Sequence, residues 1–528
     1  MAPATVNLDA LIHREDFSSD ATTAGGRPRD TISLTDLRDD GFFHHSLRKP
    51  DFQRETTHWT PTAVFELIKA FLDGDLIPAV IMWERGNEYF IIDGAHRLSA
   101  LISWIQDDYG DGVASSARFG SAISPEQKKI AERTRALIRK QIGSYSEFRG
   151  LVGQKIADPV KARWVKRLGG GAIDIQWVTA ATPKAAEDSF FKINQSAQPI
   201  DPTERHILQT RNSPNAIAAR CIARAGRGHK YWSAFAETKQ EEIEALGDEI
   251  YQILYKPAVA KQPVTTADLP IAGQGYNALP FVFELVCISN DIGIALSKTA
   301  KKLPSAPSDD NDGSRTIEFL RRVRKRLELV STNHPGSLGL HPLVYCYSST
   351  GGFQANAFLA TTEFALKLHK ENRKKEFVAV RERFERYIVF NRQFVSLTMS
   401  RLGAGERSMS RIVDLYWQIF EGMSRGLSEK QIFDGLLEQA KFKHLRQLDV
   451  PPPSAELEKS VSGASNTSKS AAFIRAALES PTRCSECGAS LHMNSVTFDH
   501  IVRVRDGGSN RSENLGPAHP YCNSGHKS

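Results

Sequence analysis

Two pairs of metal-ligating residues within residues 484–528 constrain this chain most strongly. Cys484 and Cys487 are separated by two residues, and His519 and Cys522 have the same spacing. In C-x-x-C and H-x-x-C pairs, a tight turn points two side chains at one tetrahedral zinc ion. The spacing therefore predicts a closed, structural zinc site that provides the folding energy of a small module.

A second set of polar residues lies between and beside these pairs: Asp499, His500, Asn514 and Asn523. Oxygen ligands and an imidazole suit a hard divalent cation that keeps open water positions. Phosphodiester hydrolysis needs a base that deprotonates the attacking water and a cation that neutralises charge on the phosphate. Histidine titrates in the right range for the base. We therefore predict that this second set is catalytic.

With both sets in place, the segment 484–528 resembles the HNH endonuclease family, whose ββα-metal fold holds one divalent cation against the scissile phosphate. The shared features are the two ligand pairs, Asp499-His500-Ile501, Gly507-Gly508, Asn514 and Asn523. The resemblance implies that His500 is the general base and that Asp499 and Asn523 bind the catalytic metal. It also implies that Asn514 fixes the loop that aims His500.

The segment departs from the family pattern at two positions. The family often ends in Cys-x-x-Cys-His, whereas here His519 replaces the first cysteine and Asn523 stands in place of the last histidine. An amide oxygen favours Mg²⁺ or Mn²⁺ over zinc or nickel at the catalytic position. His526 is an alternative ligand there, and a zinc-stabilised DNA-binding module without activity is the alternative interpretation of the segment.

In the N-terminal half, a predicted strand at residues 88–92 runs into Asp93-Gly94-Ala95-His96-Arg97 and then into a helical apolar period. A strand, a glycine turn and a helix direct backbone N–H groups and the positive end of the helix dipole at a ligand. Arg97 adds a fork suited to phosphate. Upstream we expect a strand at residues 79–83 and a helix capped by Thr60. The alternative role of these charges is an internal network that only holds the turn.

The segment from Arg48 to Trp104 resembles the N-terminal domain of GmrSD-type restriction proteins, a ParB/sulfiredoxin-like fold. The resemblance is carried by Gln53-Arg54, Trp59, Ile77-Pro78 and the Asp93–Arg97 run, with Ala95-His96 where the family has Gln-Gln. A second stretch, Phe190–Glu204, resembles the family's Phe-x-x-x-Asn element, although Ala197 replaces its glycine. Together they cover roughly residues 30–210. The implied nucleotide-binding or NTPase residues are Gln53, Arg54, Asp93, Gly94, His96, Arg97, Asn194 and Gln195.

Composition indicates the limits of the domains. Residues 1–30 are polar and rich in small residues, so we expect a flexible N-terminus, followed by a sensor or NTPase domain at residues 31–210. Amphipathic periodicity predicts a helical spacer at residues 211–450, which either carries DNA contacts or is purely structural. A linker at residues 451–472 would then tether a nuclease domain at residues 473–528. The predicted fold class is α+β: a ParB/sulfiredoxin-like domain, a mostly helical middle and a small zinc-bound ββα-metal domain.

The net charge of +7 is compatible with a nucleic-acid partner. Basic clusters at residues 321–326 and 367–375 could contact phosphates or form solvated helix faces. Beyond the zinc ligands, Cys221, Cys287 and Cys346 are predicted to be buried thiols in a reducing cytosol. The N-terminus lacks the features of a signal peptide, and no apolar run is long enough to span a membrane. We therefore expect a cytoplasmic location and no membrane partner.

These observations lead to one main functional prediction: a metal-dependent HNH DNA endonuclease that nicks or cuts double-stranded DNA. The GmrSD resemblance implies control by NTP hydrolysis, with GTP or CTP as candidates, or by sensing phosphorothioate or base-modified DNA, in restriction or anti-phage defence. The predicted ions are structural Zn²⁺ and catalytic Mg²⁺ or Mn²⁺. To cut both strands, an HNH site has to act either as one of a pair in two protomers or twice on the same DNA. A homodimer is therefore compatible with a double-strand cut. The alternatives are a nucleotide-switched DNA-binding protein and an N-terminal nucleotide hydrolase as the main activity.

Overall fold

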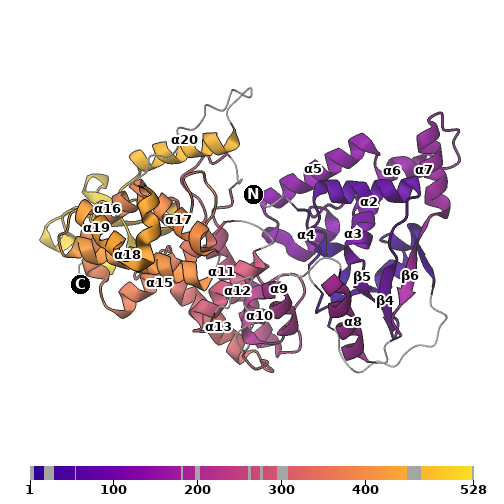
Figure 1. Cartoon of the computed structure of the whole chain (residues 1–528), viewed down its shortest axis with the longest axis horizontal. Coiled ribbons are helices and arrows are strands. Elements are labelled where there is room, and N and C mark those ends of the chain that lie inside the picture. The colour runs from indigo at the N-terminus through magenta and orange to yellow at the C-terminus, as the bar shows by residue number, and fades with distance from the viewer. Residues whose placement is uncertain are drawn as a thin grey trace. The chain divides into compact units, whose positions relative to one another are not determined.

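A six-stranded mixed sheet organises the N-terminal half of the chain (Figure 1). The computed structural model describes residues 5–16, 29–53, 55–179, 182–196, 202–259, 263–273, 278–293, 307–403, 405–448 and 465–525. In spatial order the strands are β1 (His13–Glu15), β3 (Leu47–Pro50), β5 (Glu88–Asp93), β4 (Val80–Arg85), β6 (Ala172–Trp177) and β2 (Thr31–Ser33). Strands β1, β3 and β5 are parallel, so their carboxyl ends meet at one edge of the sheet.

The central hairpin shows why both faces of this sheet are covered. Strands β4 and β5 pair antiparallel across a turn in which Gly86 has a φ of +58°, which confirms the two predicted strands. Met82 and Ile91 point into the larger hydrophobic core with helices α2 (Pro61–Asp73) and α3 (Ala95–Gln106). Trp83 and Phe90 point to the other face, where they pack with residues of helix α8 (Pro183–Ser196). Burial on both faces makes this hairpin the centre of the fold.

Helices cover the sheet where the sequence supplies caps and apolar stripes. The Thr60 side chain accepts a hydrogen bond from Ala63 N at 3.2 Å, and α2 begins at Pro61, as predicted. The N-terminal helices are α1 (Phe42–Ser46), α2 (Pro61–Asp73), α3 (Ala95–Gln106), α4 (Val113–Phe119), α5 (Pro125–Gln141), α6 (Tyr145–Gly150), α7 (Pro159–Gly170), α8 (Pro183–Ser196), α9 (Pro202–Gln209) and α10 (Pro214–Ala223).

The first residues of the chain correct one prediction. Residues 5–16, which lie in the expected flexible N-terminus, form a short helical turn and strand β1. Val6, Leu8, Leu11 and Ile12 are buried in the main core. These apolar residues are separated by polar ones that are themselves buried, so composition alone masked their packing. Residues 1–4 and 17–28 lie outside the described residues.

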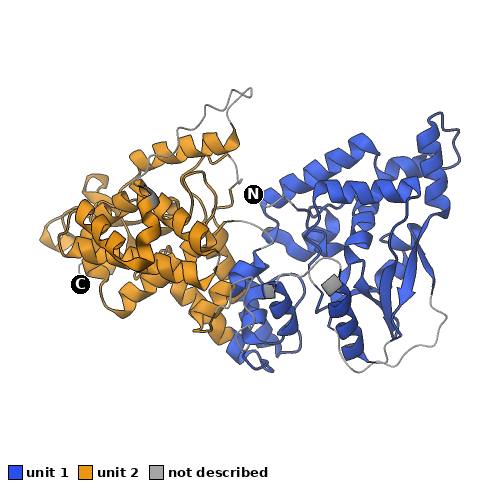
Figure 2. Ribbon diagram, in the orientation of Figure 1, with its two compact units in different colours: residues 1–245, 275–283, 306–316 blue, residues 246–274, 284–305, 317–528 orange. Residues whose placement is uncertain are grey.

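The chain divides into two compact units, shown in Figure 2. Unit 1 comprises residues 1–245, 275–283 and 306–316, and unit 2 comprises the remainder. The division falls within α11 (Glu237–Tyr255), α12 (Leu279–Ser289) and α13 (Ser314–Glu328), whereas composition places a limit near residue 210. Helices α9 and α10 belong to unit 1. The ion pairs Arg211–Asp51 and Arg224–Glu55 connect the segment that follows α9 to the rest of this unit.

Unit 2 is mostly helical, and its helices pack around aromatic side chains. The ring centroids of Phe364 and Phe384 lie 5.7 Å apart, and those of Phe377 and Phe420 lie 5.9 Å apart. The helices are α14 (Pro342–Tyr345), α15 (Ala355–Lys370), α16 (Lys374–Phe390), α17 (Gln393–Leu402), α18 (Glu406–Ser424), α19 (Glu429–Glu438) and α20 (Asn466–Glu479). Among the described residues, no helix has the length and apolar character needed to cross a membrane.

The C-terminal segment belongs to unit 2 and is packed onto its helical part, which corrects the expectation of a tethered module. A two-stranded sheet pairs β7 (Thr497–His500) with β8 (Leu515–Ala518). Ser495 Oγ donates to Thr332 O at 2.7 Å, and Tyr521 N donates to Ser337 O at 3.1 Å. Helix α20 begins at Asn466, inside the predicted linker, and residues 451–464 lie outside the described residues. Both contacts are accepted by backbone carbonyls of the loops, which do not depend on the residue type. The sequence could therefore not predict that the segment docks here.

Candidate functional site

The four predicted zinc ligands come together in the structure. Cys484 and Cys487 lie in one turn, and His519 and Cys522 follow β8. Their ligand atoms all lie within 4.8 Å of one another, and three of the four residues are buried. In the first turn, Gly488 N donates to Cys484 O at 2.9 Å, and Gly488 has a φ of +69°. Glycine adopts this conformation without strain, so it closes the turn that holds the first ligand pair.

The donor set fits a structural zinc ion. His519 Nε2 lies 3.1 Å from Ser490 O, and because a carbonyl only accepts, His519 Nδ1 keeps its lone pair. This Nδ1 lies 3.5 Å from Cys487 Sγ and 3.8 Å from Cys522 Sγ. Hydrogen bonds from Cys487 and Cys522 lower the pKa of the Cys484 thiol, whereas hydrogen bonding with Cys484 raises the pKa of Cys487 and of Cys522. Three sulfurs and one imidazole nitrogen form the closed ligand set of a structural site.

Helix α16 supports this zinc site. Arg381 is fully buried, with its Nε 2.7 Å from Glu385 Oε1 and its Nη2 3.0 Å from Gly339 O. Glu385 Oε2 accepts from Ser490 N at 3.2 Å, so α16 holds the residue that orients His519. A Cβ at Gly339, whose φ is +60°, would lie 2.6 Å from His519 Cδ2. Only glycine lets the backbone approach the zinc ligand this closely.

His500 is the last residue of β7 and pairs with Leu515 on β8. Its Nε2 lies 2.8 Å from Asn510 Oδ1. Because the amide oxygen only accepts, Nε2 carries the hydrogen and Nδ1 is the nitrogen that can take a proton. The sequence alone did not single out Asn510, although a polar residue shortly after the Gly507-Gly508 turn was an available signal.

Asn514 closes the loop that joins β7 to β8. Its Nδ2 donates to Val502 O at 2.9 Å and to Ser509 O at 2.7 Å, while its Oδ1 accepts from Val502 N at 2.8 Å. Asn510, the hydrogen-bond partner of His500, lies in the loop that these bonds hold. This geometry is consistent with the predicted role of Asn514 in aiming His500, which stays a prediction.

Asn523 and Asp499 are the predicted ligands of the catalytic cation. Asn523 lies in the turn Tyr521–Gly525, and its Nδ2 donates to Phe498 O at 3.1 Å and to Thr497 Oγ1 at 3.3 Å. These bonds use the amide donor, so the amide oxygen is the atom left for a cation. Asp499 is half-buried beside His500 on β7 and supplies a carboxylate. An amide and a carboxylate oxygen fit Mg²⁺ or Mn²⁺, whose other positions water and phosphate can fill. The alternative ligand His526 lies outside the described residues.

The surface around His500 is open, in contrast to the zinc site. Phe498 and Ile501, on either side of the Asp499-His500 pair, are both 65% exposed. The loop that follows carries three arginines: Arg503, Arg505 and Arg511. Among the described residues, none of the three has an ion-pair partner in the structure. A half-buried histidine beside a loop that carries three arginines and one aspartate, Asp506, suits a polyanionic substrate.

The N-terminal turn has the predicted local structure, with its charges paired. Strand β5 ends at Asp93, Gly94 has a φ of +101°, and α3 begins at Ala95. Arg97 Nη2 donates to Asp93 Oδ2 at 2.7 Å and to Ala79 O at 3.1 Å. The aspartate and the arginine thus bind each other, which is the arrangement of the internal network given above as the alternative.

Aromatic side chains surround His96 at the start of α3. The rings of His96 and Trp59 are stacked with centroids 5.8 Å apart, and the His58 ring lies 5.9 Å from His96. His58 Nε2 also lies 3.8 Å from Glu204 Oε2 of α9. The structure therefore brings His96 together with Trp59 and Glu204, residues from three separate parts of the sequence.

The remaining predicted N-terminal residues differ in how far the structure places them. Gln53 is only 6% exposed, and its Nε2 lies 3.4 Å from Ile92 O, next to Asp93. Arg54 lies outside the described residues. Asn194 and Gln195 lie at the end of α8, and their side chains are outside the described part of the structure. Gln53 is therefore the predicted residue that the structure links most directly to the Asp93 turn.

A buried ion network behind this turn was missed by the sequence reasoning. Arg14 Nη2 lies 3.1 Å and Lys49 Nζ 2.6 Å from Asp9 Oδ1, and Arg14 Nη1 donates to Gln53 O at 2.6 Å. Although burial raises the pKa of Asp9, Lys49 and Arg14 hold it well below its ordinary value. Burial lowers the pKa of Lys49 to about 8. The available signal was that charged residues stand within short strands at positions where the alternation of apolar and polar residues does not account for them.

Comparison with known protein families gives two matches. Residues 34–256 match the GmrSD restriction endonuclease N-terminal domain, and residues 484–528 match the HNH endonuclease model. Comparison with curated proteins and with solved structures gives no match. The two family matches cover the Asp93 turn and the His500 site, and together they describe the architecture of a restriction-type HNH nuclease.

Proposed function

The chain joins a GmrSD-type N-terminal domain to an HNH endonuclease domain, and from this premise we propose that it is a metal-dependent endonuclease that nicks or cuts double-stranded DNA under N-terminal control. The observation that carries the proposal is the pairing of His500 Nε2 with Asn510 Oδ1 on an open surface. This pairing leaves Nδ1 as a base that a substrate can reach. The zinc site beside it is closed and serves the fold.

His500 acts on the attacking water. Its Nδ1 takes a proton from the water as the water oxygen attacks phosphorus, and one P–O bond of the phosphodiester breaks. Asn510 keeps the ring in the tautomer and orientation that this transfer needs. His500 has to be neutral to accept this proton.

Asp499 and Asn523 would hold the catalytic cation. A bound Mg²⁺ or Mn²⁺ supplies Lewis-acid stabilisation of the charge that builds up on the phosphate. The hydrogen bonds of Asn523 to β7 keep its amide oxygen fixed relative to the strand that carries Asp499. Asn514 contributes by holding the loop rather than by touching the substrate.

Duplex DNA would approach the loop at residues 501–511. Arg503, Arg505 and Arg511 supply positive charge for backbone phosphates, and exposed Ile501 and Val504 provide apolar contact with sugars or bases. Phosphate contacts dominate such binding, so affinity should fall steeply with salt. The loop therefore favours DNA over a small-molecule phosphodiester as substrate.

The N-terminal domain, with its ParB/sulfiredoxin-like fold, would control cleavage by binding or hydrolysing a nucleotide such as GTP or CTP, or by sensing phosphorothioate or base-modified DNA. The family match and the turn formed by Asp93, Gly94 and Arg97 support this part of the proposal. Anti-phage defence or modification-dependent restriction in the cytoplasm is the biological setting that fits such control. A homodimer would supply two HNH sites for a double-strand cut.

The test is plasmid cleavage by the full-length protein with Mg²⁺ or Mn²⁺, on matched modified and unmodified DNA, with and without each NTP. The wild type should nick or cut the plasmid, and His500→Ala should lower the rate about 10²–10⁴-fold. His369→Ala, which changes an exposed histidine on α15, is the matched control and should leave cleavage unchanged.

The same experiment separates the alternatives. DNA binding without cleavage in any condition would favour a nucleotide-switched binding protein whose HNH module only contacts DNA. Phosphate release from an NTP that survives His500→Ala and fails in Asp93→Ala, with no cleavage of any DNA, would favour an N-terminal hydrolase as the main activity. Cleavage that His500→Ala leaves intact would overturn the proposed catalytic site.

A further inference from the structure

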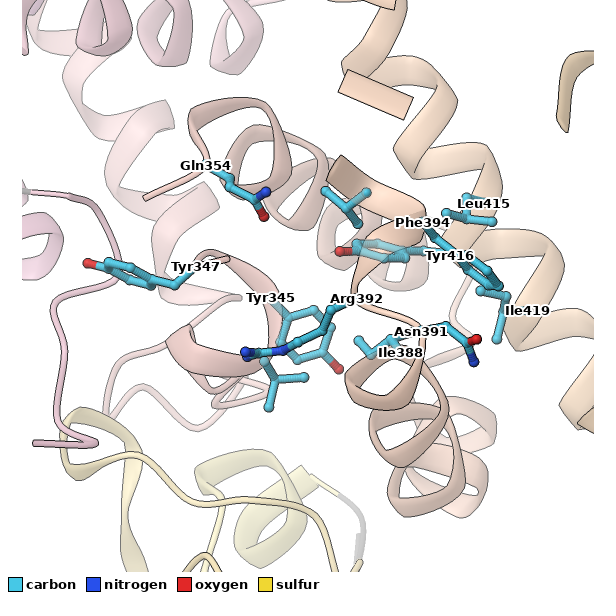
Figure 3. Close-up of a pocket in the computed structure, with 12 residues that line it drawn as sticks. Tyr345, Tyr347, Gln354, Ile388, Asn391, Arg392, Phe394, Leu415, Tyr416 and Ile419 are labelled. Carbon is cyan, nitrogen blue, oxygen red and sulfur yellow. The ribbon is translucent and has the colours of Figure 1, made fainter. Parts of the chain in front are cut away.

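A small cavity lies inside unit 2, away from the residues assigned to catalysis and zinc binding. Helices α14, α16, α17 and α18 contribute to its walls, and Tyr345, Arg392, Tyr416 and Ile419 are among the residues that line it (Figure 3). About 20 Å³ is accessible to the centres of water molecules. That is room for one or two waters, or for the head group of a small ligand.

Arg392, at the junction of α16 and α17, lacks partners on one edge of its guanidinium. Its Nε and Nη2 are both buried, and neither has a hydrogen-bond partner among the described residues. These two nitrogens form the side edge of the guanidinium fork, the edge that binds two oxygens of one oxyanion. Burial lowers the pKa of Arg392 to about 10, and the nearby Tyr416 offsets this only in part.

Helix α16, which ends two residues before Arg392, shows how this fold satisfies a buried guanidinium when the partner is internal. Arg381 of this helix is more deeply buried than Arg392, and it is paired with Glu385 and with backbone carbonyls including that of Gly339. For Arg392, no carboxylate lies within ion-pair distance among the described residues. Leaving a buried cation without a counter-charge is costly, so an acceptor from outside the chain would be stabilising.

The polar groups that line the cavity are already used elsewhere. The Tyr345 hydroxyl donates to Glu385 Oε1 at 3.2 Å, and Gln354 Nε2 donates to Ser396 Oγ at 3.1 Å. Asn391 Nδ2 donates to Tyr387 O at 3.0 Å. A water molecule could accept one hydrogen bond from Arg392, but it would leave the positive charge uncompensated.

We propose that this cavity binds the oxyanion head group of a small ligand, a carboxylate or a phosphate, with two of its oxygens on Nε and Nη2 of Arg392. The tyrosine and isoleucine walls exclude bulk water and strengthen the charge-assisted hydrogen bonds. The narrow space excludes a phosphodiester within a duplex, so the site is separate from DNA binding. It does not depend on the proposed nuclease activity.

The test measures the thermal stability of the full-length protein during titration with sodium phosphate or sodium acetate, each against sodium chloride at equal ionic strength. A ligand that binds the folded state raises the unfolding temperature in a concentration-dependent way. We expect a saturable rise with at least one of the two anions, and the anion that acts identifies the head group. Arg392→Met keeps the length of the side chain and removes its charge, so this variant should abolish the rise in unfolding temperature.

Two further variants make the result decisive. Arg386→Met changes an exposed arginine of α16 and should retain the full effect of the anion. Arg392→Lys keeps the charge but loses the paired N–H groups, and it should weaken binding; it also serves if Arg392→Met does not fold. A rise that persists in both Arg392 variants would place the anion elsewhere and overturn the proposal. No rise beyond chloride in the wild type would show that only water fills the cavity.

Discussion

The His500 site and the Asp93 turn differ in whether their predicted functional side chains bind each other. His500 has one nitrogen bound to Asn510, on a surface where neighbouring apolar residues are exposed. Asp93 and Arg97 instead bind each other, and Gln53 beside them is buried. We therefore propose that the first site takes a phosphodiester as it stands. A ligand of the second must either fit around the ion pair or replace one of its partners.

The two regions also differ in what holds them. The HNH segment is small; it contains the Cys/His cluster that could hold a metal ion, and it contacts α16. The Asp93 turn is part of a six-stranded sheet with a large hydrophobic core on one face. Perturbing the metal should therefore destroy one region and leave the other folded.

Removal of zinc should produce the largest difference between the regions. Structural zinc contributes about 10–16 kcal/mol in small modules, so Cys484→Ser should unfold the nuclease segment and abolish DNA cleavage. The transition of unit 1 should keep its midpoint. Calorimetry of the full-length protein, together with zinc analysis, would measure both effects.

Ser485→Ala supplies the control for this substitution, because Ser485 is adjacent to Cys484 and its hydroxyl only donates to Pro517 O. It should retain zinc and cleavage. Full nuclease activity in Cys484→Ser would refute the zinc assignment. Loss of both transitions would refute the independence of unit 1.

Acid should weaken unit 2 through two buried histidines. Burial lowers the pKa of His341 to about 3 and that of His492 to about 4, and their rings lie 5.5 Å apart. Both titrate near 6.5 in the unfolded chain, which therefore binds more protons below that pH. Stability should be complete above the unfolded pKa and fall as pH drops toward 4, by roughly 3–5 kcal/mol per imidazole.

His341→Asn tests this dependence without removing the helix cap, since His341 Nδ1 accepts from Leu343 N and asparagine is a good N-cap residue. Urea unfolding at several pH values should give a shallower loss of stability for the variant. An unchanged pH slope would show that His341 does not stay neutral in the folded protein.

Asn510 should affect the cleavage rate by orienting the His500 ring rather than by binding DNA. Asn510→Ala removes the acceptor at 2.8 Å from His500 Nε2 and should lower kcat about tenfold, which corresponds to about 1.4 kcal/mol in the barrier. The affinity for DNA should change little. Asn510→Asp retains an oxygen acceptor and should recover most of the rate, whereas equal defects in both variants would indicate a purely structural role.

The local elements of both sites could be predicted from the sequence because their signals are short-range. Thr60, the Gly86 turn and the glycine after Asp93 each act within a few residues. The ligand pairs around Cys484 and His519 carry their geometry in their spacing. Turn chemistry and helix capping therefore placed the elements that hold the candidate residues.

What the sequence did not reveal depends on contacts between distant segments. Nothing local predicts that Arg381 of α16 would bind Glu385 and hold the zinc segment, or that Gly339 would lie against His519. Burial of Asp9 with Lys49 is likewise decided by the sheet that forms around them. Because of such long-range packing, the C-terminal segment is docked rather than tethered, and part of the expected flexible N-terminus forms a strand.

Asp93→Asn should have the smallest effect on stability and the greatest value for interpreting the N-terminal turn. Asparagine has nearly the same shape but removes the charge that binds Arg97, so unit 1 should lose about 1 kcal/mol. If the turn binds nucleotide, affinity for GTP or CTP measured by calorimetry should also change. Lys69→Met, which breaks the exposed pair with Asp73, is the matched control for stability alone. A stability loss with unchanged nucleotide binding would show that the ion pair only holds the turn, and nucleotide control would then have to reside elsewhere in the N-terminal domain.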